Sequence, residues 1–99
     1  MKELRINPFV VEDLKTIKNF IAEDNVNKAS EVIQNIYSQF EKIQQFPYIG
    51  ADLSKRVSFK TDYKYVVWEN YIILYKVGKE AVEIYRVINQ YQDIMRIFR

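Results

Sequence analysis

The sequence predicts an α+β protein in which an N-terminal strand and an antiparallel helical hairpin precede a three- to four-stranded antiparallel meander. Two observations support this class. Apolar residues recur every three or four positions through residues 8–45, and aromatic and β-branched residues dominate residues 63–88. The first pattern is typical of amphipathic helices and the second of strands. We therefore expect two layers, with both helices on one face of the sheet and the opposite face free or half covered.

The first strand and the first helix meet at Asn7 and Pro8. Leu4 and Ile6 alternate with charged residues, as in a strand with one buried face. Asn7 can cap free backbone amides, and Pro8 suits the first helical position because its missing N–H needs no partner there. The apolar spacing then predicts a helix over residues 8–23.

A second, longer helix is predicted over residues 26–45, after a polar break at residues 23–25. Because the connection is so short, the two helices must lie antiparallel. Pro47 and Gly50 end the second helix and mark a loop.

The rest of the chain is predicted to be a meander joined by two-residue turns at Glu69-Asn70 and Gly78-Lys79. Its strands are expected at residues 63–68, 71–77 and 80–88. The second strand is almost wholly apolar, which indicates a central strand covered on both faces.

Two segments are less regular. Residues 53–60 fit either a further strand or a helical turn. Residues 92–98 are predicted to form a short C-terminal helix whose apolar side chains dock on the sheet.

Composition limits the possible chemistry. The 99 residues fit one domain and include no cysteine and no histidine. Thiol chemistry, disulfides and histidine acid–base catalysis are therefore excluded, and we expect no metal and no cofactor. No signal peptide and no apolar run of membrane-spanning length are present, so a cytoplasmic protein with no membrane partner is expected.

The charge is unevenly distributed. Residues 1–50 carry six basic and seven acidic side chains, whereas residues 51–99 carry nine basic and six acidic ones. An acidic or phosphate-bearing partner would therefore meet the second half.

Several local phrases occur in a characteristic order along nearly the whole chain. They are Asn7-Pro8 followed by Asp13-Leu14, Phe46-Pro47-x-x-Gly50-Ala51-x-Leu53, Tyr63-Lys64-Tyr65-Val66-Val67, Tyr71 to Val77, Val82-x-Ile84-x-Arg86-Val87-Ile88, and Gln92-Asp93-Ile94. No single phrase is specific, but their order and spacing are. In these phrases the chain resembles the RelE/ParE superfamily of bacterial toxins, the growth-inhibiting half of type II toxin–antitoxin modules that also act in plasmid stabilization.

The resemblance implies one toxin domain over residues 1–99, neutralised by a cognate antitoxin in a toxin–antitoxin hetero-oligomer. It also implies one of two activities. RelE-like members cut messenger RNA inside the ribosome, and ParE-like members poison DNA gyrase.

The residues that match RelE-like catalytic positions favour the ParE-like branch. Lys64 stands where such toxins carry an arginine, and Lys55 matches a lysine. Gln92 replaces an expected arginine, and Phe98 replaces the expected tyrosine. The resemblance therefore predicts a gyrase poison that acts by binding. The alternatives are a ribosome-dependent endonuclease and an inactive homologue that retains antitoxin binding. A nuclease would use as catalytic residues Lys55, Lys64, Arg86 and Tyr91.

The candidate partner-binding residues are Lys55, Arg56, Lys60, Lys64 and Arg86. The first four fit either a contact with an acidic partner or nucleic acid, or a solvated edge with Asp52 and Asp62 as local partners. Arg86 is expected to share a sheet face with Val82, Ile84 and Ile88, as a functional cation or, preferably, as a member of a structural ion pair.

Other candidates have plainer interpretations. Tyrosines 63, 65, 71, 75 and 85 fit either base stacking or, preferably, sheet packing and antitoxin contacts. Glu12 and Asp13 are interpreted as helix-start surface residues.

Overall fold

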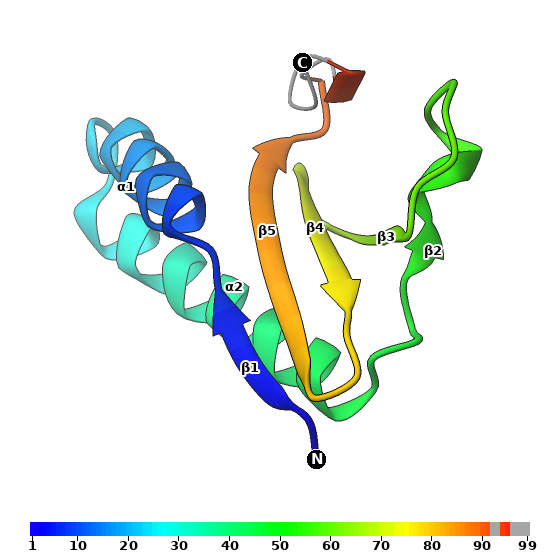
Figure 1. The fold of residues 1–99 in the computed structure, drawn as a ribbon. Coiled ribbons are helices and arrows are strands. Elements are labelled where there is room, and N and C mark those ends of the chain that lie inside the picture. Colours follow the sequence, from blue (N-terminus) through cyan, green and yellow to red (C-terminus); the bar gives the residue numbers. More distant parts are fainter. Residues whose placement is uncertain (92–93, 96–99) are drawn as a thin grey trace.

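The computed structural model describes residues 1–91 and 94–95 (Figure 1). Its helices are α1 (Pro8–Ala22), α2 (Val26–Gln45) and the short 3-10 helix η1 (Leu53–Lys55). Its strands are β1 (Glu3–Ile6), β2 (Ala51–Asp52), β3 (Tyr63–Trp68), β4 (Tyr71–Val77) and β5 (Ala81–Asn89). The predicted α+β class and element order are confirmed. The undecided segment after Gly50 contains a two-residue strand followed by a helical turn.

The five strands form one mixed sheet in the order β1-β5-β4-β3-β2. Strands β2 to β5 pair antiparallel as the predicted meander, and β4 lies inside the sheet as expected. β1 runs parallel to β5, with Leu4 opposite Val82 and Ile6 opposite Ile84. The helical hairpin therefore connects the edge strand β1 to the antiparallel part of the sheet.

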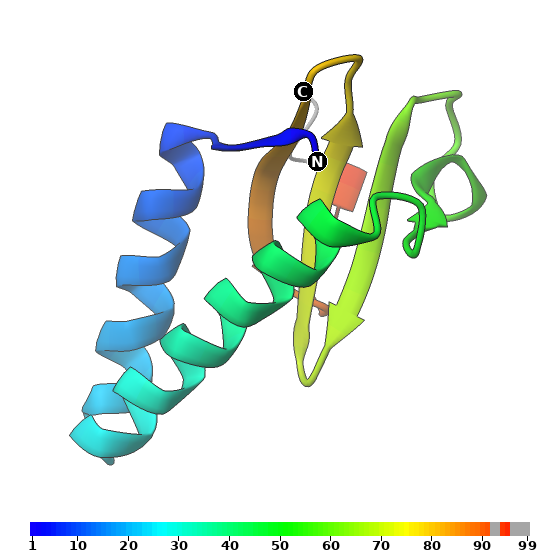
Figure 2. The same ribbon diagram turned by 90° about the horizontal axis from the view of Figure 1, so that it is seen from below.

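Both helices lie on one side of the sheet, as Figure 2 shows. Asn7 caps α1, since its side-chain oxygen accepts a hydrogen bond from the Phe9 amide at 3.0 Å. Asn25 caps α2 in the same way through the Lys28 amide at 2.9 Å. These two caps set where the helices begin, and α1 ends one residue before the predicted position.

The sheet has a buried cluster on each face. The helix-side cluster contains Val10, Leu14, Val32, Ile36, Phe40, Ile43, Ile73, Tyr75, Val82, Ile84 and Val87. The helix-free face carries a smaller cluster of Leu53, Ile72, Leu74, Ile88 and Ile94. The expected terminal helix lies mostly outside the described residues, but Ile94 is buried in the second cluster.

Two hydrogen bonds made by the side chain of Tyr75, in β4, hold the loop after α2 against the sheet. The Tyr75 hydroxyl donates to the Pro47 carbonyl at 2.7 Å and accepts from the Gly50 amide at 2.9 Å. A Cβ at position 50 would lie 2.5 Å from that hydroxyl and 2.8 Å from the Tyr65 carbonyl. Glycine is therefore required there by the close approach of the sheet.

Within residues 1–91 and 94–95, neither long helix has the length and apolar character needed to cross a bilayer.

Candidate functional site

Asp13 and Arg86 form a bidentate ion pair between α1 and β5. Both donor–acceptor distances are 2.8 Å, and the same carboxylate also accepts from the Val87 amide at 2.9 Å. The two side chains are only 11% and 25% exposed, respectively. The expected surface role of Asp13 was therefore wrong, whereas the preferred structural ion pair of Arg86 is present. The hydrogen bonds to Asp13 raise the pKa of Arg86.

The ion pair lies next to the part of β5 that extends beyond its pairing with β1. The last β1 pairing is at Ile84, so the following amides of β5 have no strand partner on that edge. The Asp13 carboxylate takes that role for Val87. A side chain of α1 thus continues the sheet edge that β1 leaves open.

A β-bulge changes which face the residues of β5 occupy. Opposite β4, Ile84 pairs with Tyr75 but Arg86 pairs with Leu74, so Tyr85 is an extra residue. As a result Ile84 packs on the helix side and Ile88 on the helix-free side. The expected alternation of Arg86 with Val82, Ile84 and Ile88 on one face was wrong because the bulge interrupts it.

A partly apolar groove runs between the helical hairpin and the sheet. Its first section, of about 420 Å³, is lined by Ile17, Phe20 and Tyr71, with Asp13 and Arg86 at its polar end. A second section continues past Phe20 and Tyr71 to Trp68 and α2. We call the whole the hairpin groove. Phe20 is 72% exposed there and offers apolar surface to a partner.

The predicted basic cluster lies at the other end of the sheet. The Lys64 ammonium donates to Asp52 at 2.8 Å, which lowers the pKa of Asp52 and raises that of Lys64. The Arg56 guanidinium lies 5.1 Å from the centroid of the Tyr65 ring. Lys55 and Lys60 are exposed. Asp52 is therefore a local partner of Lys64, as the interpretation of the cluster as a solvated edge predicts.

The candidate catalytic residues lie in three separate places. Lys55, in η1, and Lys64, in β3, lie near the β2–β3 edge, whereas Arg86 lies on β5, is held there by Asp13, and is separated from β3 by β4. Tyr91 is 83% exposed and follows Gln90, whose amide donates to Asn70 in the β3–β4 turn. Lys64 stands at the opposite end of β3 from that turn. These four side chains do not converge on one point.

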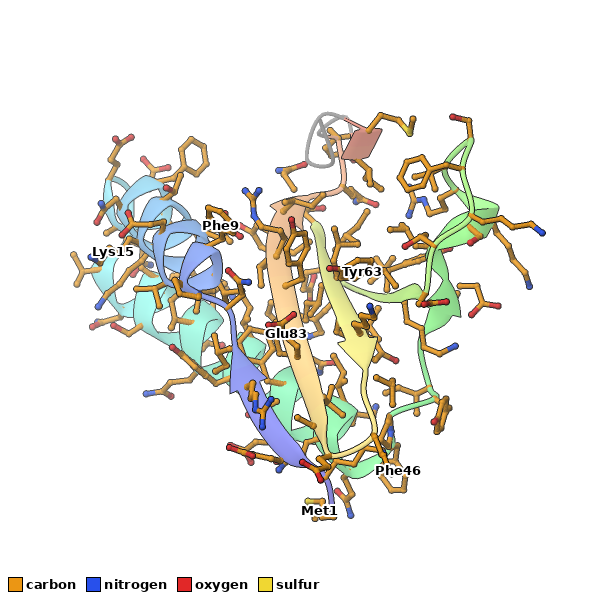
Figure 3. The ribbon with its side chains drawn as sticks, viewed as in Figure 1. Met1, Phe9, Lys15, Phe46, Tyr63 and Glu83 are labelled. Carbon is orange, nitrogen blue, oxygen red and sulfur yellow. The ribbon has the colours of Figure 1, made fainter. Side chains whose placement is uncertain are left out.

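Tyr63 and Tyr85 pack on the helix-free face, as the preferred interpretation expected, but the contribution of Phe9 was not predicted. The Tyr63 and Tyr85 rings are 5.0 Å apart between centroids, although β4 separates their strands. The Tyr85 ring meets Phe9 edge-on at 6.4 Å. Figure 3 shows Phe9 on α1 and Tyr63 on the far side of β5 and β4. Tyr71 and Tyr75 pack on the helix side instead. The tyrosines predicted aromatic side chains on the sheet, but no sequence pattern indicated that Phe9, on α1, contacts them.

Known proteins resemble this chain in family and in fold. The family model of the ParE toxin of the type II toxin–antitoxin system parDE matches residues 4–94. The chain belongs to this family. A chain in a solved structure of the chromosomal ParDE toxin–antitoxin system from P. aeruginosa is similar to this chain, with a TM-score of 0.75 and 21% sequence identity. That similarity covers 90% of this chain and 96% of the other, and it supports the fold. No curated protein sequence matches.

Proposed function

We propose that this ParE-type toxin acts by binding DNA gyrase and stabilising its cleavage complex with DNA, without covalent chemistry of its own. The observation that carries the proposal is the separation of Lys55, Lys64, Arg86 and Tyr91 into three places. A binding toxin needs complementary surface, and it does not need a converging set of acids, bases and phosphate clamps.

Metal-free RNA cleavage requires a base for the 2′-hydroxyl, cations for the developing phosphorane charge and an acid for the leaving oxygen. The charges of Lys64 and Arg86 are balanced by Asp52 and Asp13, respectively. Tyr91 lies beside the β3–β4 turn, at the opposite end of β3 from Lys64. This arrangement supports the binding activity over the endonuclease.

The two activities predict opposite results when the toxin is produced without antitoxin. We expect induction of the DNA-damage response, intact messenger RNA, and accumulation of cleaved DNA in purified gyrase reactions. The endonuclease would instead produce new transcript ends on ribosomes within minutes. Transcript cleavage that falls about a hundredfold or more in Tyr91→Phe with Lys64→Ala would contradict the proposal. A protein that does neither would be the inactive homologue.

An antitoxin is the partner implied by the toxin–antitoxin family. We propose that it crosses the sheet as an extended acidic segment, with apolar side chains in the hairpin groove and acidic ones at Lys55, Arg56 and Lys60. The groove and the basic cluster lie at opposite ends of the sheet, as Figure 1 shows for α1 and η1. A compact partner would reach one of them, whereas a segment that folds on binding can reach both.

Charge reversal tests this second contact. We expect Lys55→Glu with Arg56→Glu and Lys60→Glu to slow antitoxin association about tenfold or more at low salt, because the cluster attracts an acidic segment. The salt dependence of the association rate should fall as well. Lys18→Glu, on α1, is the matched control and should have a smaller effect. Equal association rates for the triple variant and the unmodified toxin would remove the cluster from the interface.

A further inference from the structure

The strand β1 forms one edge of the sheet, and no other strand of the chain lies on its outer side among the described residues (Figure 1). The Asn7 amide, just after β1, donates to the Ile84 carbonyl of β5 at 2.9 Å, so odd-numbered positions direct their backbone groups to β5. The N–H and C=O groups of Leu4 and Ile6 therefore point outward. They form a row of backbone donors and acceptors that a further strand can use.

This edge lacks most of the features by which edge strands avoid association. The opposite edge of the sheet ends in β2, which has only two residues. By contrast, β1 has four residues with neither a proline nor a bulge. Leu4 and Ile6 pack on the helix-side cluster but are only partly buried. The charges of β1 are Glu3 and Arg5, which alternate with them on the helix-free face and remain more than half exposed. Whether these charges repel a second strand depends on its register.

The sequence of β1 is complementary to itself in one antiparallel register. Around a twofold axis at Leu4, the outward groups of Leu4 bond to those of Leu4 in a second copy. Glu3 of each copy then lies opposite Arg5 of the other, at a pair of positions where side chains come closest. A twofold axis at Glu3 would place two glutamates opposite each other, and one at Arg5 would place two arginines. Like charges directly opposite are destabilising, so the register at Leu4 is favoured.

The charges of the neighbouring strands extend this pattern. The register aligns Arg5 of β1 with Glu83 of β5 and Lys76 of β4, so that the signs alternate along one row of the sheet. All three side chains line a groove of about 350 Å³ on the helix-free face. In the register at Leu4, Glu3 of the second copy adds the next negative charge, directly beside Arg5.

We propose that two copies of this chain associate through β1, antiparallel around a twofold axis at Leu4, so that their two five-stranded sheets become one. The occupant is a second copy because the two charges of β1 complement each other under this symmetry, whereas an acidic or a basic segment would oppose one of them. The association goes beyond the proposed function, since the hairpin groove and the basic cluster lie away from the outer side of β1.

Sedimentation equilibrium of the full-length toxin over a range of concentrations tests the association. We expect the mass to approach twice the 12.0 kDa of the chain as concentration rises. Arg5→Glu and Glu3→Arg each place like charges opposite in both cross-strand pairs, and each should raise the dissociation constant about tenfold or more. Mixing the two variants should restore association, because a chain with two glutamates then faces a chain with two arginines. Glu3→Arg with Arg5→Glu in one chain should also restore it.

Matched controls reverse the same charges elsewhere. Glu12 and Lys15 form an exposed pair on α1 at 3.6 Å. Lys15→Glu and Glu12→Lys should leave the dissociation constant of the unmodified toxin unchanged, and their mixture should associate no more tightly than either alone. Circular dichroism and thermal midpoints should show that every variant remains folded, because all the substituted side chains are exposed.

The proposal is overturned if the unmodified toxin stays monomeric at every concentration, or if it forms a dimer that Arg5→Glu and Glu3→Arg leave as tight as the controls do. Failure of the mixed variants to associate would also overturn it, because the charges would then not meet across the two copies. A monomeric toxin whose antitoxin binding is weakened by the same substitutions would assign this edge to a strand of the antitoxin instead. Gyrase inhibition is measured in parallel and tests only the proposed function.

Discussion

Replacing Ile73 by aspartate is expected to prevent folding. Ile73 lies in the interior strand β4, is fully buried, and belongs to the cluster between sheet and helices. A carboxylate there has no cation partner among the described residues of that cluster and would lose its hydration. Burying such a charge costs several kcal/mol or shifts the group to its neutral form, and the isoleucine packing is lost as well. The total is comparable with the stability of a small domain, about 5–15 kcal/mol.

Val67→Asp is the matched control. Val67 is a β-branched strand residue of β3 that is 49% exposed, so an aspartate there can remain hydrated. We expect this variant to unfold cooperatively, with a modest loss of stability, and Ile73→Asp to lack a cooperative transition by circular dichroism. A native-like transition for Ile73→Asp, or rapid hydrogen exchange across residues 71–77 in the unmodified protein, would contradict the interior position of β4.

The parts of the fold that the sequence predicts are those with local signals. Both helices show apolar residues at intervals of three and four. Asn7 marks the start of the first helix, and the structure confirms that its side chain caps that helix. The turn at Glu69-Asn70 separates two aromatic and β-branched runs. Each feature depends on residues within a few positions of one another, so spacing is sufficient to find it.

The features that sequence reasoning missed depend on residues far apart. No short-range sequence pattern predicts that β1 pairs parallel with β5, because the alternation of Leu4 and Ile6 is compatible with a strand at either edge of the sheet. The bulge at Tyr85 has no glycine or proline to mark it, and it reverses the expected face of Ile88. Asp13 resembles any early helical carboxylate until β5, more than 70 residues later, brings Arg86 beside it.

The same limit applies to the candidate site. The composition identifies cations and tyrosines, but which of these side chains contact one another depends on the register between neighbouring strands. Lys64 has its own carboxylate in Asp52, and Arg86 has Asp13. Lys76, which was not singled out, lies over Tyr63 directly across the β3–β4 pair. A surface defined by cross-strand neighbours becomes visible once the strand order is known.

The contact between Asp13 and β5 leads to the second large expected effect. Asp13→Ala removes three hydrogen bonds at once, two from Arg86 and one from the Val87 amide. A charge and an amide at the sheet edge then lose their partner. Breaking a buried ion pair costs about 3–5 kcal/mol, and because Arg86 is 25% exposed we expect about 2–3 kcal/mol.

Asp13→Asn should be less severe than Asp13→Ala, because an amide oxygen can still accept from the Val87 amide while the charge partner of Arg86 is lost. Glu12→Ala is the matched control. Glu12 is the preceding residue of α1, its side chain is 74% exposed, and its pairing with Lys15 is 3.6 Å long. Its removal should change stability by at most about 0.5 kcal/mol. Urea unfolding midpoints with unchanged slopes measure all three. If Asp13→Ala cost no more than Glu12→Ala, the carboxylate would not hold α1 to the open edge of β5, and the positions of Phe9 and Arg86 would need another cause.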